Sequence, residues 1–155
     1  SPLGRSKCSM VSPMQSGRAA ICRRPSAICA ILSPMQLSEY AGIARELGLS
    51  ALVEAHDEKE VEMALAAGAR IVGVNNRNLK DFTVDIKNSI RLREMVSSET
   101  IFVSESGIRG VEDMKALYEN GTDAVLIGEL LMRKSDRKAA LMELKQQTGR
   151  QLDMN

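Results

Sequence analysis

Short apolar runs alternate with amphipathic segments along most of this chain, and this alternation restricts the folds that it can adopt. Each run is too short for a helix, and most are rich in Val, Ile and Leu, as strands buried on both faces are. The expected strands are 27–32, 51–55, 70–74, 101–103 and 124–127.

The segments between these runs have the periodicity of helices that bury one face. The expected helices are 35–47, 57–67, 85–96, 110–120 and 136–147, with one short helical turn at 129–132. Asp57 suits the N-cap position of its helix, and Glu60 is placed to complete a capping box. Strands and helices that alternate with short links predict parallel strands and right-handed crossovers, so the sequence indicates an α/β barrel or a doubly wound sheet.

The overall composition excludes several classes of protein. The 155 residues suit one domain, and no stretch approaches the roughly 18 unbroken apolar residues of a membrane-spanning helix. A net charge of +1, 3% aromatic residues and no Trp argue against nucleic-acid binding. Cys8, Cys22 and Cys29 form no metal-binding pattern or disulfide framework, so we expect reduced thiols in a cytoplasmic protein that needs no metal or cofactor.

The charge is unevenly distributed, because residues 1–38 carry five basic side chains and no acidic one. The first 26 residues are also rich in Ser, Pro and Gly and lack sustained periodicity, so 1–26 is expected to be a basic, disordered leader. An organelle transit peptide and a truncated or recombined gene start are alternatives for this segment. The rest of the chain then divides into one domain at 27–150 and a tail at 151–155.

Polar residues follow several of the expected strands, where parallel α/β proteins place their active sites. Glu54 and Glu105 each stand inside or just beyond an apolar run, and a buried carboxylate is costly unless it is paired or used. We expect the two glutamates to lie on neighbouring strands and to face one cavity, where they would serve acid–base chemistry. The alternative for each residue alone is a salt-bridged acid in a loop.

The last two strand exits have the features of a phosphate cradle. Gly107 and Gly128 allow close backbone approach, and the short helical turn after Gly128 would present N–H groups to an anion. The Glu129 side chain must then point away, so that only its backbone N–H contributes. Arg77 is the better loop cation for binding a substrate carboxylate, and His56 is more typical of a structural role than of an acid–base role.

Four linked motifs stand at these strand exits. They are Leu-Val-Glu-Ala-His-Asp (52–57), Gly-Val-Asn-Asn-Arg-Asn-Leu (73–79), Ser-Glu-Ser-Gly-Ile (104–108) and Leu-Ile-Gly-Glu-Leu-Leu-Met-Arg (126–133). Their order and spacing over about 27–147 resemble the C-terminal half of indole-3-glycerol phosphate synthase, a (β/α)8 TIM barrel of tryptophan biosynthesis. The resemblance implies a partial barrel of about five parallel strands, equivalent to family strands four to eight.

The resemblance also implies a lyase activity and roles for the residues at the middle strand exits. The family closes the indole ring of a carboxyphenylamino-deoxyribulose phosphate and releases carbon dioxide and water. By this likeness Glu54 matches the glutamate used in acid–base chemistry during dehydration, and Asn75 matches the asparagine that orients the substrate. Glu105 and Ser106 match a pair that contacts the substrate and a catalytic lysine.

The remaining motif residues match the two ends of the family's substrate. Arg77 lies in the loop that the family places near the anthranilate end. Gly107, Gly128 and the backbone of Glu129 match the phosphate site. These assignments imply a phosphosugar substrate that is bound at its anthranilate end and at its phosphate.

The chain departs from the family pattern before residue 27. The family's glutamate and lysine on strand one and its catalytic lysine on strand three have no counterpart, so the isolated chain is expected to be inactive without an N-terminal half. Unpaired edges at 27–32 and 124–127 would invite self-association or pairing with a complementary half-barrel. Two other functions stay open, namely a non-catalytic phosphate-binding or assembly module and a different phosphosugar barrel such as a phosphoribosyl isomerase. The Asn-Asn-Arg-Asn and Glu-Ser-Gly-Ile motifs argue against the isomerase.

Overall fold

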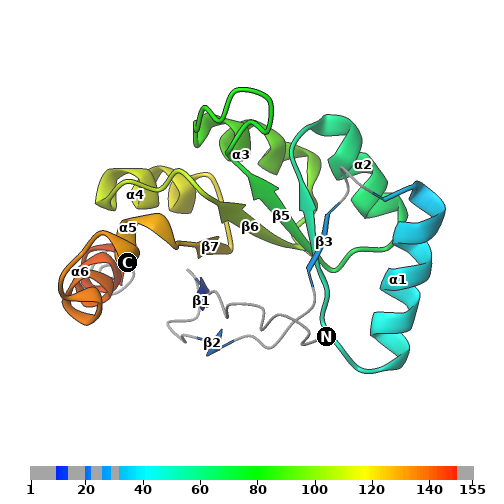
Figure 1. Ribbon diagram of the computed structural model, residues 1–155, viewed down its shortest axis with the longest axis horizontal. Helices are drawn as coiled ribbons and strands as arrows, with labels where there is room; N and C mark the ends of the chain where they lie inside the picture. Colours follow the sequence, from blue (N-terminus) through cyan, green and yellow to red (C-terminus); the bar gives the residue numbers. More distant parts are fainter. Residues whose placement is uncertain (1–9, 14–19, 22–25, 29–31, 150–155) are drawn as a thin grey trace, which may run out of the picture.

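The computed structural model describes residues 10–13, 20–21, 26–28 and 32–149. Five of its strands form a parallel array in which each strand pairs with the next along the chain. They are β3 (Ser26–Ile28), β4 (Leu52–Ala55), β5 (Ile71–Asn75), β6 (Ile101–Glu105) and β7 (Ala124–Leu126) (Figure 1). The expectation of about five parallel strands in an α/β fold is therefore confirmed.

Helices follow these strands at the predicted places. They are α1 (Pro34–Glu46), α2 (Glu58–Ala66), α3 (Lys87–Leu92), α4 (Val111–Glu119), α5 (Glu129–Met132) and α6 (Arg137–Gly149). The expected helix 85–96 is divided, since a 3-10 turn, Arg93–Met95, follows α3. Among the described residues, no helix has both the length and the hydropathy that crossing a membrane requires.

The start of α2 shows how the sequence sets a helix boundary. Asp57 is the N-cap, and its carboxylate accepts a 2.9 Å hydrogen bond from the Glu60 backbone N–H, as expected. The Glu60 carboxylate does not complete the predicted capping box, because it accepts the backbone N–H of His56 instead, at 2.7 Å. This hydrogen bond ties the backbone of His56 to the first turn of α2.

The edge of β7 is covered, so the expectation of an open edge at 124–127 is wrong. β1 (Met10–Pro13) pairs antiparallel with β7, and β2 (Ala20–Ile21) pairs antiparallel with β1. The sheet order is therefore β2-β1-β7-β6-β5-β4-β3, with β3 as the terminal strand at the other end. Both added strands come from the segment 1–26, of which residues 1–9, 14–19 and 22–25 lie outside the described part of the chain, as do Cys8, Cys22 and Cys29.

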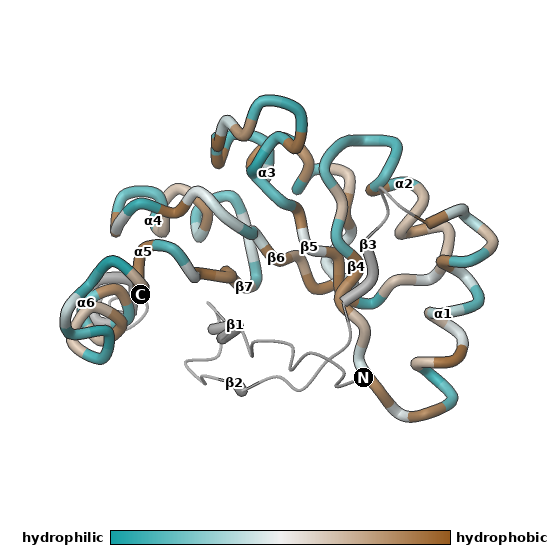
Figure 2. Tube along the Cα trace, in the orientation of Figure 1, coloured by the Kyte–Doolittle hydropathy of each residue, from teal (hydrophilic) through white to brown (hydrophobic). Residues whose placement is uncertain are grey.

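The two faces of the parallel strands have different surroundings. The face covered by α1, α2 and α3, here called the helix face, is packed with apolar side chains: Val53, Val72, Val74 and Phe102 from the strands, and Leu37, Val61, Ala64 and Leu92 from the helices. Figure 2 shows hydrophobic residues along the strands and a mixture of hydrophilic and hydrophobic residues along the helices that form an arc around them. The opposite face, here called the interior face, has only a small apolar cluster of Ile71, Val103 and Ala124. Polar groups occupy its carboxyl end.

Candidate active site

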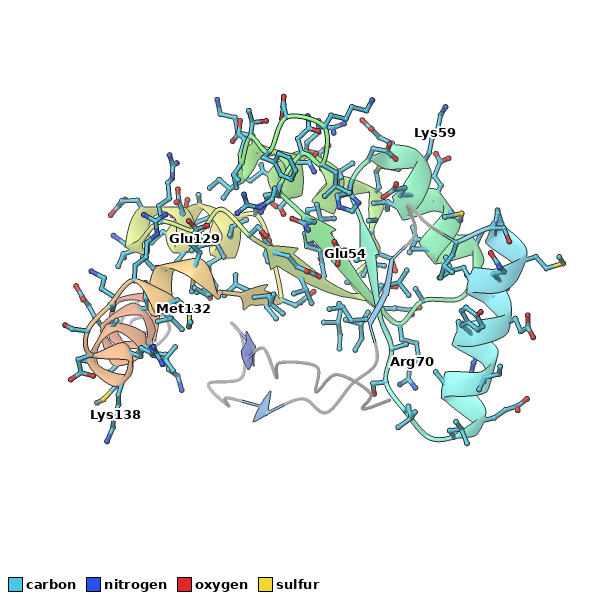
Figure 3. All side chains as sticks on the ribbon, in the orientation of Figure 1. Glu54, Lys59, Arg70, Glu129, Met132 and Lys138 are labelled. Carbon is cyan, nitrogen blue, oxygen red and sulfur yellow. The ribbon has the colours of Figure 1, made fainter. Side chains whose placement is uncertain are left out.

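Polar side chains from three strands meet at the carboxyl end of the interior face. Glu54 is paired with Gly73 in the register of β4 and β5, and Asn75 is paired with Glu105 in the register of β5 and β6. The Asn75 side-chain amide donates a 2.8 Å hydrogen bond to Glu54 Oε1. Figure 3 shows Glu54 over the strands, whereas Lys59 projects outward from α2.

Glu105 is a deeply buried carboxyl group within this cluster. It is 6% exposed, and its Oε1 atom has no hydrogen-bond partner in the described structure. Burial, with a further contribution from the nearby Glu54 carboxylate, raises the pKa of Glu105 to about 8. The two glutamates therefore share one site, although β5 separates the strands that the sequence analysis placed next to each other. A protonated carboxyl beside a second carboxylate can serve as an acid and base pair.

Gly73 makes room for this arrangement. A Cβ atom on residue 73 would overlap Glu105 Oε1 and would lie 3.0 Å from Leu52 Cδ1. The position between the two glutamates must therefore lack a side chain, because Glu105 leans across β5. The sequence analysis missed this role, although an interior strand glycine is a signal of close approach by another group.

A buried polar network lies behind the site, on the helix face. The Asn76 amide nitrogen donates to Ser104 Oγ at 2.9 Å and to the Ser106 carbonyl at 3.0 Å. The Asn76 amide oxygen accepts hydrogen bonds from the Ser89 backbone N–H at 3.0 Å and from Ser89 Oγ at 2.8 Å. These bonds tie the ends of β5 and β6 to α3, and so fix the backbone that presents Asn75. The sequence analysis selected Asn75 and missed Asn76, although alternation along a strand predicts opposite faces for two adjacent asparagines.

The residues predicted for substrate and phosphate binding line one open pocket of about 540 Å³ at the ends of β6 and β7. Its polar lining consists of Arg77, Ser106, Gly107, Arg109, Gly128, Glu129 and Arg133. Ser106 and Gly107 have positive φ angles of 65° and 77°. A Cβ atom on residue 107 would overlap Val84 Cγ1, so glycine is needed both for the turn and for the loop packed on it.

Glu129 is held by arginines at this pocket. Its Oε2 lies 3.2 Å from Arg77 Nη2, and its Oε1 lies 2.7 Å from Arg133 Nη2. The guanidinium proposed from the sequence as a partner for a substrate carboxylate is therefore already paired with a carboxylate of the chain. Glu129 neutralises two of the cations that an incoming anion would meet.

His56 lies beside the acidic cluster rather than away from it. Its Nδ1 is 3.0 Å from Glu60 Oε2, and its Nε2 is 3.4 Å from Glu54 Oε1. The sequence analysis favoured a structural role for His56 and did not predict its contact with Glu54. Within the described ranges, no set of three His, Cys, Asp or Glu side chains has the geometry of a metal site.

The fold defines a class of protein, namely the (β/α) barrels. The chain is similar in structure to 3-hexulose-6-phosphate synthase, with a TM-score of 0.65, 15% identity, and coverage of 79% of this chain and 60% of that one. It is also similar to a native KDPGal structure, with a TM-score of 0.56, 17% identity, and coverage of 81% and 68%. At such low identity these likenesses speak for the fold alone.

Sequence comparison identifies the family. The family model for indole-3-glycerol phosphate synthase matches residues 25–144. The indole-3-glycerol phosphate synthase of Ruminiclostridium cellulolyticum is 63% identical over 118 residues, which are 76% of this chain and 45% of that protein. That of Lactiplantibacillus plantarum is 47% identical over 134 residues, which are 86% of this chain and 52% of that protein. The chain belongs to the indole-3-glycerol phosphate synthase family, as its motifs predict, and spans about half the length of these curated relatives.

Proposed function

We propose that this chain forms the C-terminal half of a lyase that closes the indole ring of a carboxyphenylamino-deoxyribulose phosphate, with release of carbon dioxide and water. The observation that carries the proposal is the pair of Glu54 and Glu105 in one site. A carboxyl group with a pKa of about 8 stays protonated at neutral pH, beside a second carboxylate that is hydrogen bonded to Asn75. Ring closure and dehydration require a proton to be donated to oxygen and another to be removed, and a pair of carboxyl groups can do both.

The other residues of the site would bind and orient the substrate. In this proposal Asn75 orients the substrate, and Ser106 contacts it beside Glu105. Arg77 binds the carboxylate at the anthranilate end, for which it must exchange its ion pair with Glu129. A planar guanidinium is suited to this exchange, because it binds one carboxylate through two parallel hydrogen bonds.

The phosphate would occupy the pocket between the turn after β6 and the start of α5. Gly107 and Gly128 line this pocket and allow the backbone to come close to an anion. The backbone of Glu129 would contribute an N–H group, and Arg133 would contribute positive charge. Binding of a phosphate far from the reacting carbon supplies energy that orients the ring for closure.

We also infer that the chain acts with a complementary N-terminal half-barrel that carries the lysines of the family. The support is topological, since a closed barrel pairs its first strand with its last. Here β1 occupies the edge of β7, so a complementing half would have to displace β1 and also extend the sheet at β3. Self-association through the β3 edge is the competing outcome. The proposal places the protein in the cytoplasm and requires no cofactor, because carboxyl and amino groups suffice for the proton transfers.

The test is an assay of indole glycerol phosphate formation by this chain, alone and mixed with the N-terminal part of the R. cellulolyticum relative. We expect product only in the mixture. In that mixture Glu54→Gln should lower kcat by about 10²- to 10⁴-fold with little change in KM, because general acid–base catalysis has this size. Glu62→Gln is the matched control, since Glu62 is exposed on α2. No product in either condition would exclude the split-enzyme function.

The second candidate is a non-catalytic phosphate-binding module, which the arginine-lined pocket favours. The test is a calorimetric titration of the chain with ribulose 5-phosphate at low salt. Gly128→Val should weaken binding if the pocket holds the phosphate. Absence of any heat of binding to the unmodified chain would rule out this candidate.

A further inference from the structure

His56 lies between two carboxylates that come from different elements. Its ring contacts Glu60 Oε2 from the first turn of α2 at 3.0 Å and Glu54 Oε1 from β4 at 3.4 Å. The side chains of His56, Glu54 and Glu60 are only 14%, 16% and 19% exposed, so water screens these charges weakly. The His56 carbonyl accepts a 2.9 Å hydrogen bond from the Asn88 amide of α3, so three elements fix the position of this residue.

Glu60 contacts one of the two ring nitrogens of His56. Its Oε2 atom accepts the His56 backbone N–H at 2.7 Å and also contacts Nδ1 at 3.0 Å. When Glu60 is ionised, its carboxylate can only accept hydrogen bonds, and Nδ1 is then the donor in this contact. In the neutral ring Nε2 is then a bare lone pair, and this buried atom has no hydrogen-bond partner in the described structure.

The bare Nε2 faces an atom that is also an acceptor. Glu54 Oε1 accepts the 2.8 Å hydrogen bond from Asn75, and it lies 3.4 Å from His56 Nε2. Two lone pairs at this separation repel each other, whereas one proton placed between them makes the contact attractive. The geometry therefore favours a proton shared between His56 and Glu54.

We propose that His56 is a positioning residue that holds this proton for Glu54, with Glu60 fixing the ring. This inference rests on the acid–base role proposed for Glu54. In the transfer, the Nε2–H bond breaks and its electron pair stays on Nε2, while a lone pair of Oε1 forms the new O–H bond. The ring becomes neutral and keeps its Nδ1–H on Glu60, and Glu54 becomes a carboxyl group that can protonate the substrate. The reverse step restores the imidazolium.

Other charged groups lie around this triad and act on it less directly. Asp57, Arg77, Lys80 and Asp85 line the same pocket as His56, and Glu105 interacts with Glu54 across β5. Of the charged side chains in the described residues, Glu54 and Glu60 are the two that pair with the ring. The tests therefore change Glu60 and His56 in separate experiments.

The first experiment is ¹⁵N NMR of the full chain, in which His56 is the single histidine and gives unambiguous ring signals. At pH 9, where a free imidazole is neutral, we expect Nδ1 to carry the hydrogen. Glu60→Ala should move hydrogen to Nε2, whereas Glu62→Ala, exposed on the same helix, should leave the signals unchanged. A wild-type ring protonated at Nε2, or unchanged signals in folded Glu60→Ala, would overturn the proposal.

The second experiment uses the complemented enzyme. His56→Gln keeps a hydrogen-bond donor near Glu54 but cannot release a proton, so kcat should fall about tenfold with KM little changed and with a flatter pH profile. An unchanged kcat and pH profile would overturn the proton-holding role while leaving the role of Glu54 intact. If the unmodified mixture forms no product, the proposed function fails, and the NMR result still decides how Glu60 sets the ring.

Discussion

At the carboxyl ends of β5 and β6, buried polar groups lie on both faces of the sheet, but they differ in how well their hydrogen-bonding groups are paired. On the helix face, Asn76, Ser89 and Ser104 bond to one another with distances between 2.8 and 3.0 Å. On the interior face, Glu105 is similarly buried but retains an oxygen without a partner and a raised pKa. Adjacent residues divide between these faces because successive strand side chains point in opposite directions.

This difference separates the residues that hold the strand ends in place from those to which we assign acid–base chemistry. A fully bonded buried network specifies one arrangement and stabilises it. A buried carboxyl without a partner lowers stability, because its desolvation is not compensated. The bonded network on the helix face therefore holds the strand ends rigidly. This rigidity keeps Glu105 buried on the interior face although its desolvation is not compensated. Four substitutions test this contrast between the two faces.

The largest effect should come from Glu105→Gln. The folded-state pKa of about 8 lies above the ordinary value of 4.5, so the folded chain binds more protons than the unfolded chain between these pH values. The unfolding free energy therefore falls as pH rises from 4.5 to 8, by at most about 5 kcal/mol, and stays low above that range. The variant should be more stable than the parent at pH 9 and similar at pH 5. Urea unfolding at both values measures this, and equal pH slopes in the two proteins would contradict it.

Asn76→Ala should lower the unfolding free energy, whereas Glu105→Gln raises it at high pH. The effect of Asn76→Ala should not depend on pH. The substitution leaves Ser89 and Ser104 without their amide partner, and we expect a loss of about 2–4 kcal/mol in unfolding free energy. The matched control is Asn78→Ala, because Asn78 is exposed and its side chain bonds to the Lys80 backbone N–H; its cost should be within about 0.5 kcal/mol. Equal losses in the two variants would show that the network adds nothing to stability.

Gly73→Ala should cost about 1–3 kcal/mol, because the new methyl group would meet Glu105. Gly42→Ala is the control. Gly42 lies in α1 with open space around it, so that change should stabilise the chain by about 0.5–1 kcal/mol. In the Glu105→Ala background most of the Gly73→Ala cost should disappear, since the two positions are in contact. An undiminished cost in that background would show that Leu52 or the backbone is the obstacle instead.

The smallest change in stability should follow Glu129→Gln. This side chain is 60% exposed in its ion pairs with Arg77 and Arg133, so the loss should be below about 1 kcal/mol. The two arginines would gain positive potential, and inorganic phosphate should bind more tightly at low salt than to the parent chain. A phosphate titration by calorimetry at two salt concentrations measures this. Identical affinities would indicate that these arginines do not face the anion.

The sequence predicted what depends on local pattern. Apolar runs located the parallel strands, polar residues at the strand ends pointed to Glu54 and Glu105, and the family resemblance added Asn75, which the structure places in hydrogen-bonding contact with Glu54. The pairing of Arg77 with Glu129 and the space that Gly73 leaves for Glu105 were not predicted, because both depend on residues from different strands and loops. Likewise, the periodicity of the leader could not reveal β1, since its partner β7 lies at the far end of the domain.

The pairing of β1 with β7 has a consequence for the order of folding. Val11 lies opposite Leu126, so β1 acquires its partner only after β7, more than a hundred residues further along the chain, has been synthesised. Closing so long a loop is entropically unfavourable and slow compared with local contacts. We therefore expect β1 and β2 to dock late in folding, and until they dock the edge of β7 is open to pairing with another chain.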